Sequence, residues 1–398
     1  MTSASPKVAD CSIIDVPQLK DAAVEAGQNV TSNGVKSQPQ KQSARLFCFD
    51  LIRVFACYMV VQSHSGLQLI RRDVSLPNFT EIEDEDKAEI ENWFNHTSIC
   101  RADVPLFMMV SGYFLFPVKN AVVFFKRRFS RVLIPFAVWS LLYALLFLVM
   151  GIYDLPTTLL NFPKMLVRYV PRTGHLWFIY SLLGIYLYAP ILSPWVQSTS
   201  QRMMELYLTL WSCSLTLPYL NYFFPHLFLS VDLPMLHYFS GNIGYFIMSS
   251  YLKRFHSHHK TLHCVLVGLG MTLLGYSLTV AGWLFIPRPE HIYKVVIWQI
   301  LTPNVVLMAV GLFIFIRAIN WGDASTSPIH WLVSDVANKS YGIYLSHMII
   351  IYCSCYVVNM VAITFVLKLP LYSVTVFVLN YLMCKLISYL PKSNYIIG

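Results

Sequence analysis

Charged residues are scarce in this sequence. Only 12% of the 398 residues are Asp, Glu, Lys or Arg, and 56% are hydrophobic, whereas a soluble domain carries about 25% charged residues. Most of the chain therefore cannot face water. The alternating strands of about ten residues that mark a membrane β-barrel are also missing. These absences predict an all-α, polytopic membrane protein.

Other absences remove further classes of protein. The net charge is +9, but no basic run has the length and aromatic interleaving of a nucleic-acid surface, so no nucleic acid partner is predicted. The charge instead indicates orientation in the membrane and attraction to anionic membrane lipid. Cys353 and Cys355 lack the two-residue gap of a redox or zinc pair, which favours structural roles. No internal repeat is visible, which argues against an inverted-repeat transporter.

The chain divides into a polar tail and one apolar domain. Residues 1–44 are rich in Ser, Gln, Asn and Lys and are predicted to be a disordered cytoplasmic tail, not a secretory signal peptide. Residues 45–392 are predicted to form a single transmembrane domain of about ten helices of about twenty residues each. The predicted spans are 46–70, 103–118, 131–151, 174–194, 203–224, 235–252, 261–286, 293–318, 338–359 and 367–390.

The distribution of basic residues predicts the orientation of these spans. With the tail in the cytoplasm, 18 of the 29 Lys and Arg residues lie on the cytoplasmic side and 10 on the other, with Arg53 inside the membrane. The external connection 71–101 is instead rich in Asp and Glu. Because cytoplasmic connections carry the excess of Lys and Arg, both termini are predicted to be cytoplasmic.

The first span contains an arginine and a histidine on one helical face. Arg53 and His64 are eleven residues apart, which on a helix is a rotation of about 20° beyond full turns and a rise of about 16 Å. Ionisable groups inside a membrane segment indicate function. His64 could take a proton from a hydroxyl, or it could be a buried histidine paired with a neighbouring helix. Asp50 lies on the same face and could neutralise Arg53.

A second group of cations precedes the third span. Lys126, Arg127, Arg128 and Arg131 lie within six residues, and Arg128 and Arg131 are neighbours on one helical face. Arginine pairs with phosphate oxygens in bidentate geometry, so a phosphate-rich cytosolic molecule could dock there. A topology anchor at the lipid headgroups is the alternative.

Five segments of the chain, taken in order, resemble signature elements of membrane acyltransferase family 3. The spacing of Arg53 and His64 is similar to the first-helix signature of that family, an arginine or lysine separated from a histidine by ten residues. The resemblance extends over residues 45–390 and is closest to the branch that O-acetylates enterobacterial common antigen and related glycans. The other matching segments are Val104–Tyr113, Arg128–Arg131 with Ile134, Pro135 and Trp139, His175–Tyr180 with Tyr186–Pro190, and Ser340–His347.

The resemblance implies an O-acetyltransferase of the bacterial inner membrane. Such an enzyme moves an acetyl group from cytosolic acetyl-CoA, a co-substrate and not a bound cofactor, to a hydroxyl of a lipid-linked or surface glycan. By the same resemblance His64 is the catalytic base, Arg53 serves the acyl donor, and Arg128 and Arg131, with Arg127 beside them, bind the phosphates of coenzyme A.

Several further residues are predicted to line the site. The tetrahedral oxyanion needs a hydrogen-bond donor, and Arg53, Ser111 and Tyr113 all remain open for that role. The remaining pocket residues predicted are Asp50, His175, Trp177 and His347.

Some patterns are read as unrelated to the site, and other functions remain open. His330 and Asp335 match the pattern of soluble-faced glycerolipid acyltransferases, but their companion motifs are missing. The histidines at 256–263 are read as a solvated loop, and no metal site is predicted. Two other functions stay open: a transporter of an anionic substrate, and an acyltransferase with another donor such as succinyl-CoA.

Overall fold

The structure is a computed structural model that describes residues 40–70, 93–217, 219–220, 224, 239–256, 262–285, 299–322 and 327–398, all within the compact unit Gln40–Gly398. The described residues form helices and no strands, as the sequence predicts. The helices are α1 (Gln40–Ile70), η3 (Ile99–Ala102), α3 (Asp103–Leu115), α4 (Ala121–Val149), α5 (Leu155–Val167), η4 (Pro171–Leu176), α6 (Trp177–Ser198), α7 (Gln201–Ser214), α9 (Ile243–Phe255), α10 (Leu262–Phe285), α12 (Pro303–Ala318), α13 (Pro328–Asn359), α14 (Phe365–Ser388) and α15 (Asn394–Ile397).

The helices expose many large apolar side chains and bury several polar ones. Five helical stretches of the described chain are long and apolar enough to cross a membrane: Ala121–Val149, Leu155–Ser198, Leu262–Phe285, Pro328–Val358 and Phe365–Ser388. On α10, Leu273 and Leu274 are 55% and 54% exposed, while Thr272 and Thr279 are buried. This inside-out pattern suits lipid, because polar side chains must then find partners within the bundle.

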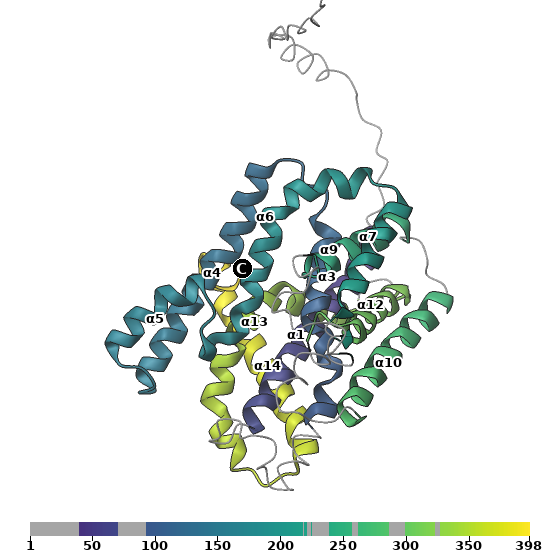
Figure 1. Cartoon of the computed structure of the whole chain (residues 1–398). Coiled ribbons are helices and arrows are strands. Elements are labelled where there is room, and N and C mark those ends of the chain that lie inside the picture. Colours follow the sequence, from purple (N-terminus) through teal and green to yellow (C-terminus); the bar gives the residue numbers. More distant parts are fainter. Residues whose placement is uncertain are drawn as a thin grey trace, which may run out of the picture. The chain divides into compact units, whose positions relative to one another are not determined.

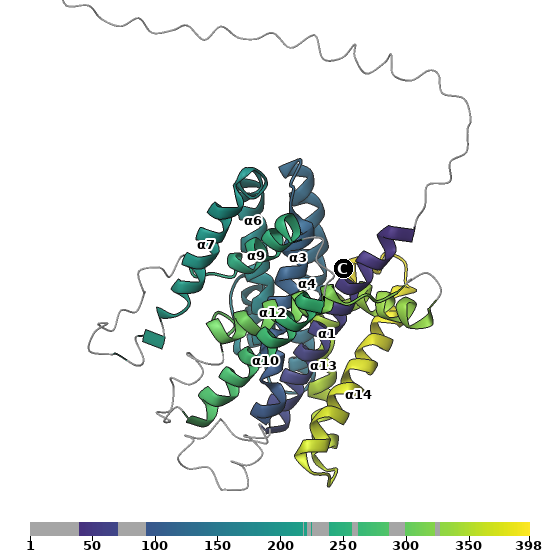
Figure 2. The same cartoon turned by 90° about the vertical axis from the view of Figure 1, so that its right-hand side faces the viewer.

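Helix α1 lies at the centre of the described bundle. It packs against α3, α12, α13 and α14, and Figures 1 and 2 both show it between the yellow α14 and the helices around α3. Phe49, Ile52, Ala56 and Val60 of α1 are all buried. Side chains on α1 can therefore contact elements that come from widely separated parts of the sequence.

Glycines allow two pairs of helices to approach closely. On α10 and α12, a Cβ at Gly268 would lie 2.6 Å from the backbone nitrogen of Phe315, and one at Gly311 would lie 2.6 Å from that of Thr272. On α3 and α9, a Cβ at Gly112 would lie 2.6 Å from Cα of Phe246. Small residues at such crossings are what membrane helix packing requires.

Substitution of Gly112 tests the α3–α9 contact. We expect Gly112→Leu to destabilise the protein by about 1–3 kcal/mol, because overpacking forces two backbones apart. Gly270→Ala is the matched control, since a Cβ at Gly270 meets nothing within 4 Å and alanine favours a helix interior. Thermal unfolding in detergent measures both, and equal midpoints would contradict the proposed packing role.

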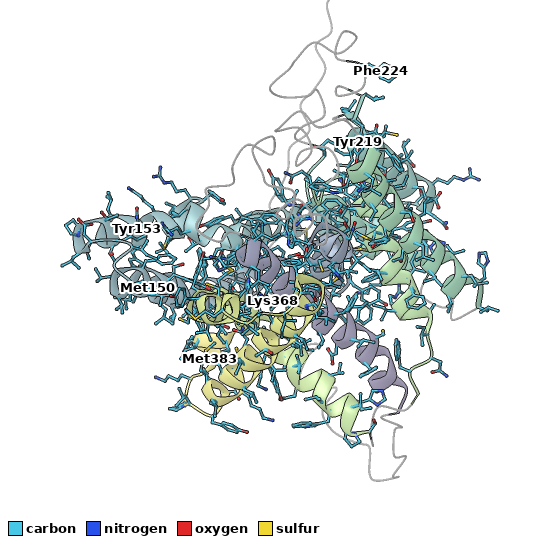
Figure 3. The ribbon with its side chains drawn as sticks, turned by 90° about the horizontal axis from the view of Figure 1, so that it is seen from below. Met150, Tyr153, Tyr219, Phe224, Lys368 and Met383 are labelled. Carbon is cyan, nitrogen blue, oxygen red and sulfur yellow. The ribbon has the colours of Figure 1, made fainter. Side chains whose placement is uncertain are left out.

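The structure adds helix α5 to the sequence prediction. The sequence places a connection at 153–173, but α5 occupies Leu155–Val167. Asp154 caps it by accepting the Thr157 backbone N–H at 2.9 Å, and hydrogen bonds from the Thr157 hydroxyl and N–H hold the pKa of Asp154 below its ordinary value. Figure 3 shows Met150 and Tyr153 together at the turn that joins α4 to α5.

Other boundaries differ or lie outside the described residues. Helix α1 begins at Gln40, so the last residues of the predicted 1–44 tail are helical, while residues 1–39 and most of the acidic connection 71–101 fall outside the described ranges. The predicted spans 103–118, 203–224 and 235–252 correspond to α3, α7 and α9, which have 13, 14 and 13 residues. The ten-span arrangement therefore stays a prediction.

Candidate active site

Three histidines meet inside the bundle. His64 of α1 lies with its ring centroid 5.1 Å from that of His347 on α13 and 6.2 Å from that of His175 in η4. The rings of His175 and His347 are 5.2 Å apart. His175 and His347 are 5% and 0% exposed, while His64 is half-buried. The structure thus brings together three histidines that the sequence predicts as site residues on separate grounds.

Tyrosines of neighbouring helices fix the surroundings of this cluster. The Tyr344 hydroxyl donates to the backbone carbonyl of His175, and the Tyr352 hydroxyl donates to that of Arg172 at 2.8 Å. These two bonds tie the 3₁₀ segment η4 to α13 and hold His175 against the other rings. The ring of Tyr143, on α4, lies 5.0 Å from that of His175.

An aromatic face of α13 connects the histidines to the opposite end of α1. Tyr341, Tyr344 and His347 are three residues apart, so they line one helical face. The rings of Tyr341 and Tyr344 stack at 6.4 Å, and the Tyr341 hydroxyl donates to the carbonyl of Val132, the residue after Arg131 on α4, at 2.8 Å. This face leads from the histidine cluster toward the predicted phosphate-binding arginines.

Arg53 is held by an ion pair that also joins two helices. Its guanidinium lies 2.9 Å from Oδ1 of Asp50, with the two side chains 33% and 17% exposed. The other oxygen of Asp50 accepts the Ser334 hydroxyl of α13 at 2.9 Å. Asp50 therefore partly neutralises Arg53, as the sequence suggested. It also links α1 to α13, which the sequence did not indicate.

Removal of Asp50 tests this linkage. We expect Asp50→Ala to lower the free energy of unfolding by about 1–3 kcal/mol, because the Arg53 guanidinium and the Ser334 hydroxyl lose their acceptor. Ser334→Ala removes a single hydrogen bond and should cost about 1 kcal/mol. Thermal unfolding in detergent compares the two, and an Asp50→Ala midpoint no lower than that of Ser334→Ala would contradict the linkage.

Arg128 and Arg131 of α4 lie in the electrostatic neighbourhood of Arg53. The positive charges of both act on the Arg53 guanidinium. Arg128 also faces the Tyr186 ring, with its guanidinium carbon 6.0 Å from the ring centroid. In the described part of the chain no carboxylate pairs with Arg128 or Arg131. The arrangement leaves uncompensated positive charge, which suits an anionic ligand.

Two further cations lie around Tyr113, whose ring is 5.3 Å from that of Phe114, the ring over which Arg53 lies. Lys253 of α9 and Arg317 of α12 lie 5.2 and 5.1 Å from the Tyr113 ring centroid. Lys253 also donates to the backbone carbonyl of Tyr113 at 2.7 Å. The sequence indicates Lys253 and Arg317 only as orientation markers at span ends, and no spacing links them to Tyr113. We call Arg53, Arg128, Arg131, Lys253 and Arg317 the cation cluster.

For three further predicted site residues the structure gives only their local surroundings. Ser111 is half-buried and makes no hydrogen bond to the described residues. Trp177 begins α6, and its ring lies 6.4 Å from that of Phe178. Arg127 is exposed, one helical step from Arg128, and its charge is not among those acting on Arg53.

The residues that the sequence discounts have local partners. The His330 ring packs edge-on against Phe47, with centroids 3.9 Å apart. Asp335 forms an ion pair with Lys339 and accepts the Tyr381 hydroxyl at 2.7 Å. Across the described ranges, no three His, Cys, Asp or Glu side chains gather in a metal-binding arrangement.

Comparison with known families now identifies the chain. A family model described as an acyltransferase domain matches residues 46–387, a region that contains the histidine cluster and the cation cluster. Comparisons with curated proteins and with solved structures give no match. The match covers most of the chain, and the all-helical structure with its apolar spans agrees with a membrane enzyme. The chain belongs to the acyltransferase 3 family.

Proposed function

We propose that this acyltransferase moves an acetyl group from cytosolic acetyl-CoA to a sugar hydroxyl of a lipid-linked or surface glycan. The observation that carries the proposal is the pairing of two sites along α1. The histidine cluster lies around His64, the cation cluster lies around Arg53, and the helical rise between these two residues is about 16 Å. A hydroxyl-activating group and an anion-binding group thus share one helix.

The cation cluster supports the donor half of the proposal. Coenzyme A carries a diphosphate and a 3′-phosphate, and arginine forks bind phosphate oxygens in pairs. Arg128, Arg131 and Arg317 have no carboxylate partner among the described residues, so their charge is available to such a ligand. Lys253 and Arg53 add to the positive field, and Arg127 at the exposed edge would extend it.

The face of Tyr341 and Tyr344 supports a path for the acyl arm. With the nucleotide on the cation cluster, an arm lying along this face would carry the thioester toward His64. His64 takes the proton of the acceptor hydroxyl, and the oxygen attacks the thioester carbonyl. The carbon–sulfur bond then breaks, and the proton passes to the departing thiolate. This arrangement assigns the oxyanion to none of the three donors that the sequence leaves open. Arg53 and Tyr113 lie at the cation cluster, about 16 Å of helix rise from His64, and Ser111 makes no hydrogen bond among the described residues.

The proposed setting is a bacterial inner membrane. In this arrangement about ten spans cross the bilayer, both termini are cytoplasmic, and the Arg53 end of α1 faces the cytosol where acetyl-CoA is found. The excess of Lys and Arg in the connections on that side supports this orientation. The acceptor would then meet His64 from the opposite side, and the branch of enzymes that acetylate enterobacterial common antigen is the proposed relative.

Labelled acetyl-CoA tests the function directly. Membranes that contain the wild-type protein are expected to transfer label to a glycan fraction and to release free coenzyme A, while membranes without the protein do neither. Label from succinyl-CoA but not acetyl-CoA would reassign the donor. Movement of an anion into proteoliposomes with no release of coenzyme A would contradict the enzyme and favour a transporter.

A further inference from the structure

The tautomer of His347 is determined by its backbone contact. Its Nδ1 lies 2.6 Å from the carbonyl oxygen of Tyr344. A carbonyl oxygen only accepts hydrogen bonds, so Nδ1 of the neutral ring must carry the proton. Nε2 of His347 is therefore a bare lone pair, able to accept a hydrogen bond or a proton.

This lone pair is buried without a partner. The His347 side chain is 0% exposed, and its Nε2 makes no hydrogen bond in the structure. A buried polar atom without a hydrogen bond is destabilising, so a partner for this atom is expected to arrive in the working enzyme. The nearest imidazole with access to solvent is His64, whose ring centroid lies 5.1 Å away at an interplanar angle of 42°.

We propose that His347 is a positioning residue for His64, and this inference rests on the proposed function. In the reacting enzyme, rotation of the His64 ring lets its N–H donate to Nε2 of His347. That bond fixes the tautomer of His64 and leaves its other nitrogen bare toward the acceptor hydroxyl. Hydrogen bonds of this kind are often unformed in an enzyme without substrate and tighten when it binds.

The proton balance of the step is complete. The acceptor O–H bond breaks as an N–H bond forms on His64, which becomes a cation. Nε2 of His347 stabilises that cation by accepting a hydrogen bond from the N–H of His64 that already faces it. The Tyr344 carbonyl polarises the ring of His347 from the other side. The acceptor oxygen forms a bond to the carbonyl carbon of the thioester, the carbon–sulfur bond breaks with its electron pair going to sulfur, and His64 gives the proton to the thiolate.

His175 is the alternative candidate for the residue that positions His64. Its Nε2 is also buried without a partner, but its ring centroid is 6.2 Å from that of His64, and no hydrogen bond from its ring to a described residue determines its tautomer. The other polar rings that face the cluster, those of Tyr143 and Tyr344, belong to hydroxyls that donate to the backbone of Leu345 and His175. Of the two histidines, His347 has its ring closer to that of His64 and is the one whose hydrogen bond shows that Nε2 carries the lone pair.

His347→Gln and His347→Ala test the inference in the full-length protein in proteoliposomes. We expect His347→Gln to lower kcat for acetyl transfer at least tenfold while KM for acetyl-CoA stays within twofold, because the cation cluster is untouched. His64→Ala combined with His347→Gln should be no slower than His64→Ala, since a positioning residue acts only through the group it positions. His330→Gln, on the same helix but packed against Phe47, is the matched control and should keep wild-type kcat.

Chemical rescue separates a basic lone pair from simple packing. Added imidazole should restore at least tenfold of the lost rate in His347→Ala, whereas pyrazole, a ring of the same shape but much weaker basicity, should not. Equal rescue by both, a His347→Gln enzyme within twofold of wild type, or a larger loss in His175→Gln than in His347→Gln would overturn the role of His347. A wild-type protein that transfers no acetyl group would instead overturn the proposed function.

Discussion

Replacement of His64 by alanine is expected to lower acetyl transfer by about 10²–10⁴-fold, the usual contribution of a general base. The loss should fall on kcat, with KM for acetyl-CoA little changed, because the cation cluster lies about 16 Å away along α1. Transfer of label from acetyl-CoA to the glycan fraction, together with release of coenzyme A, gives both constants.

His263→Ala is the control for this experiment, since His263 is an exposed histidine near the start of α10. It should leave transfer unchanged. Both variants should elute from gel filtration as the wild type does, because His64 is only half-buried. Equal labelling of glycan by wild type and His64→Ala would remove His64 from the catalytic role.

Replacement of Arg128 by alanine is expected to abolish the preference for the 3′-phosphate of coenzyme A. A charge-assisted hydrogen bond contributes about 1.5–3 kcal/mol, which corresponds to about 10- to 100-fold in affinity. The wild type should therefore bind acetyl-CoA more tightly than 3′-dephospho-acetyl-CoA by about that factor. In Arg128→Ala the two donors should bind alike, and Arg131→Ala should lose part of the preference.

Lys126→Ala supplies the comparison, because Lys126 is an exposed cation on the same helix. It removes the same charge but should keep the full preference for the 3′-phosphate. Titration of both donors against each variant in detergent measures the effect. If the preference in Arg128→Ala stays as large as in the wild type, Arg128 does not contact the 3′-phosphate.

The assignment as a membrane protein and the pairing of Arg53 with Asp50 were predictable, because the first depends on composition and the second on the spacing of residues along one helix. Composition identifies the class, and the helical period places residues on a face. The ion pair at three residues' spacing, with the two side chains 2.9 Å apart, follows directly from that period. The helix α5 was not predicted, since its 13 residues are too few to cross a membrane and Pro156 and Pro163 interrupt a helical pattern.

The full cation cluster could not be predicted from the sequence, because part of it depends on contacts between helices. Arg128 and Arg131 form a recognisable pair in the sequence, but Lys253 and Arg317 reach Tyr113 only because α9 and α12 pack close to α3. The close approach of α9 depends on Gly112, where a Cβ would meet the Phe246 backbone. A glycine in an apolar run gives no sign of which helix it will contact, so a single sequence cannot supply these partners.

The sequence by itself determined that this is a helical membrane protein, and that its first apolar helix carries a cation and an imidazole on one face. Both conclusions follow from the helix repeat and from the cost of placing charge in lipid, and these can be applied to a sequence without knowledge of its tertiary contacts. Only the tertiary structure decided that His175 and His347 join His64, and that the lone pair of His347 lies buried beside it. Those contacts come from helices distant in the chain, and packing between helices, not spacing along one, sets which side chains meet.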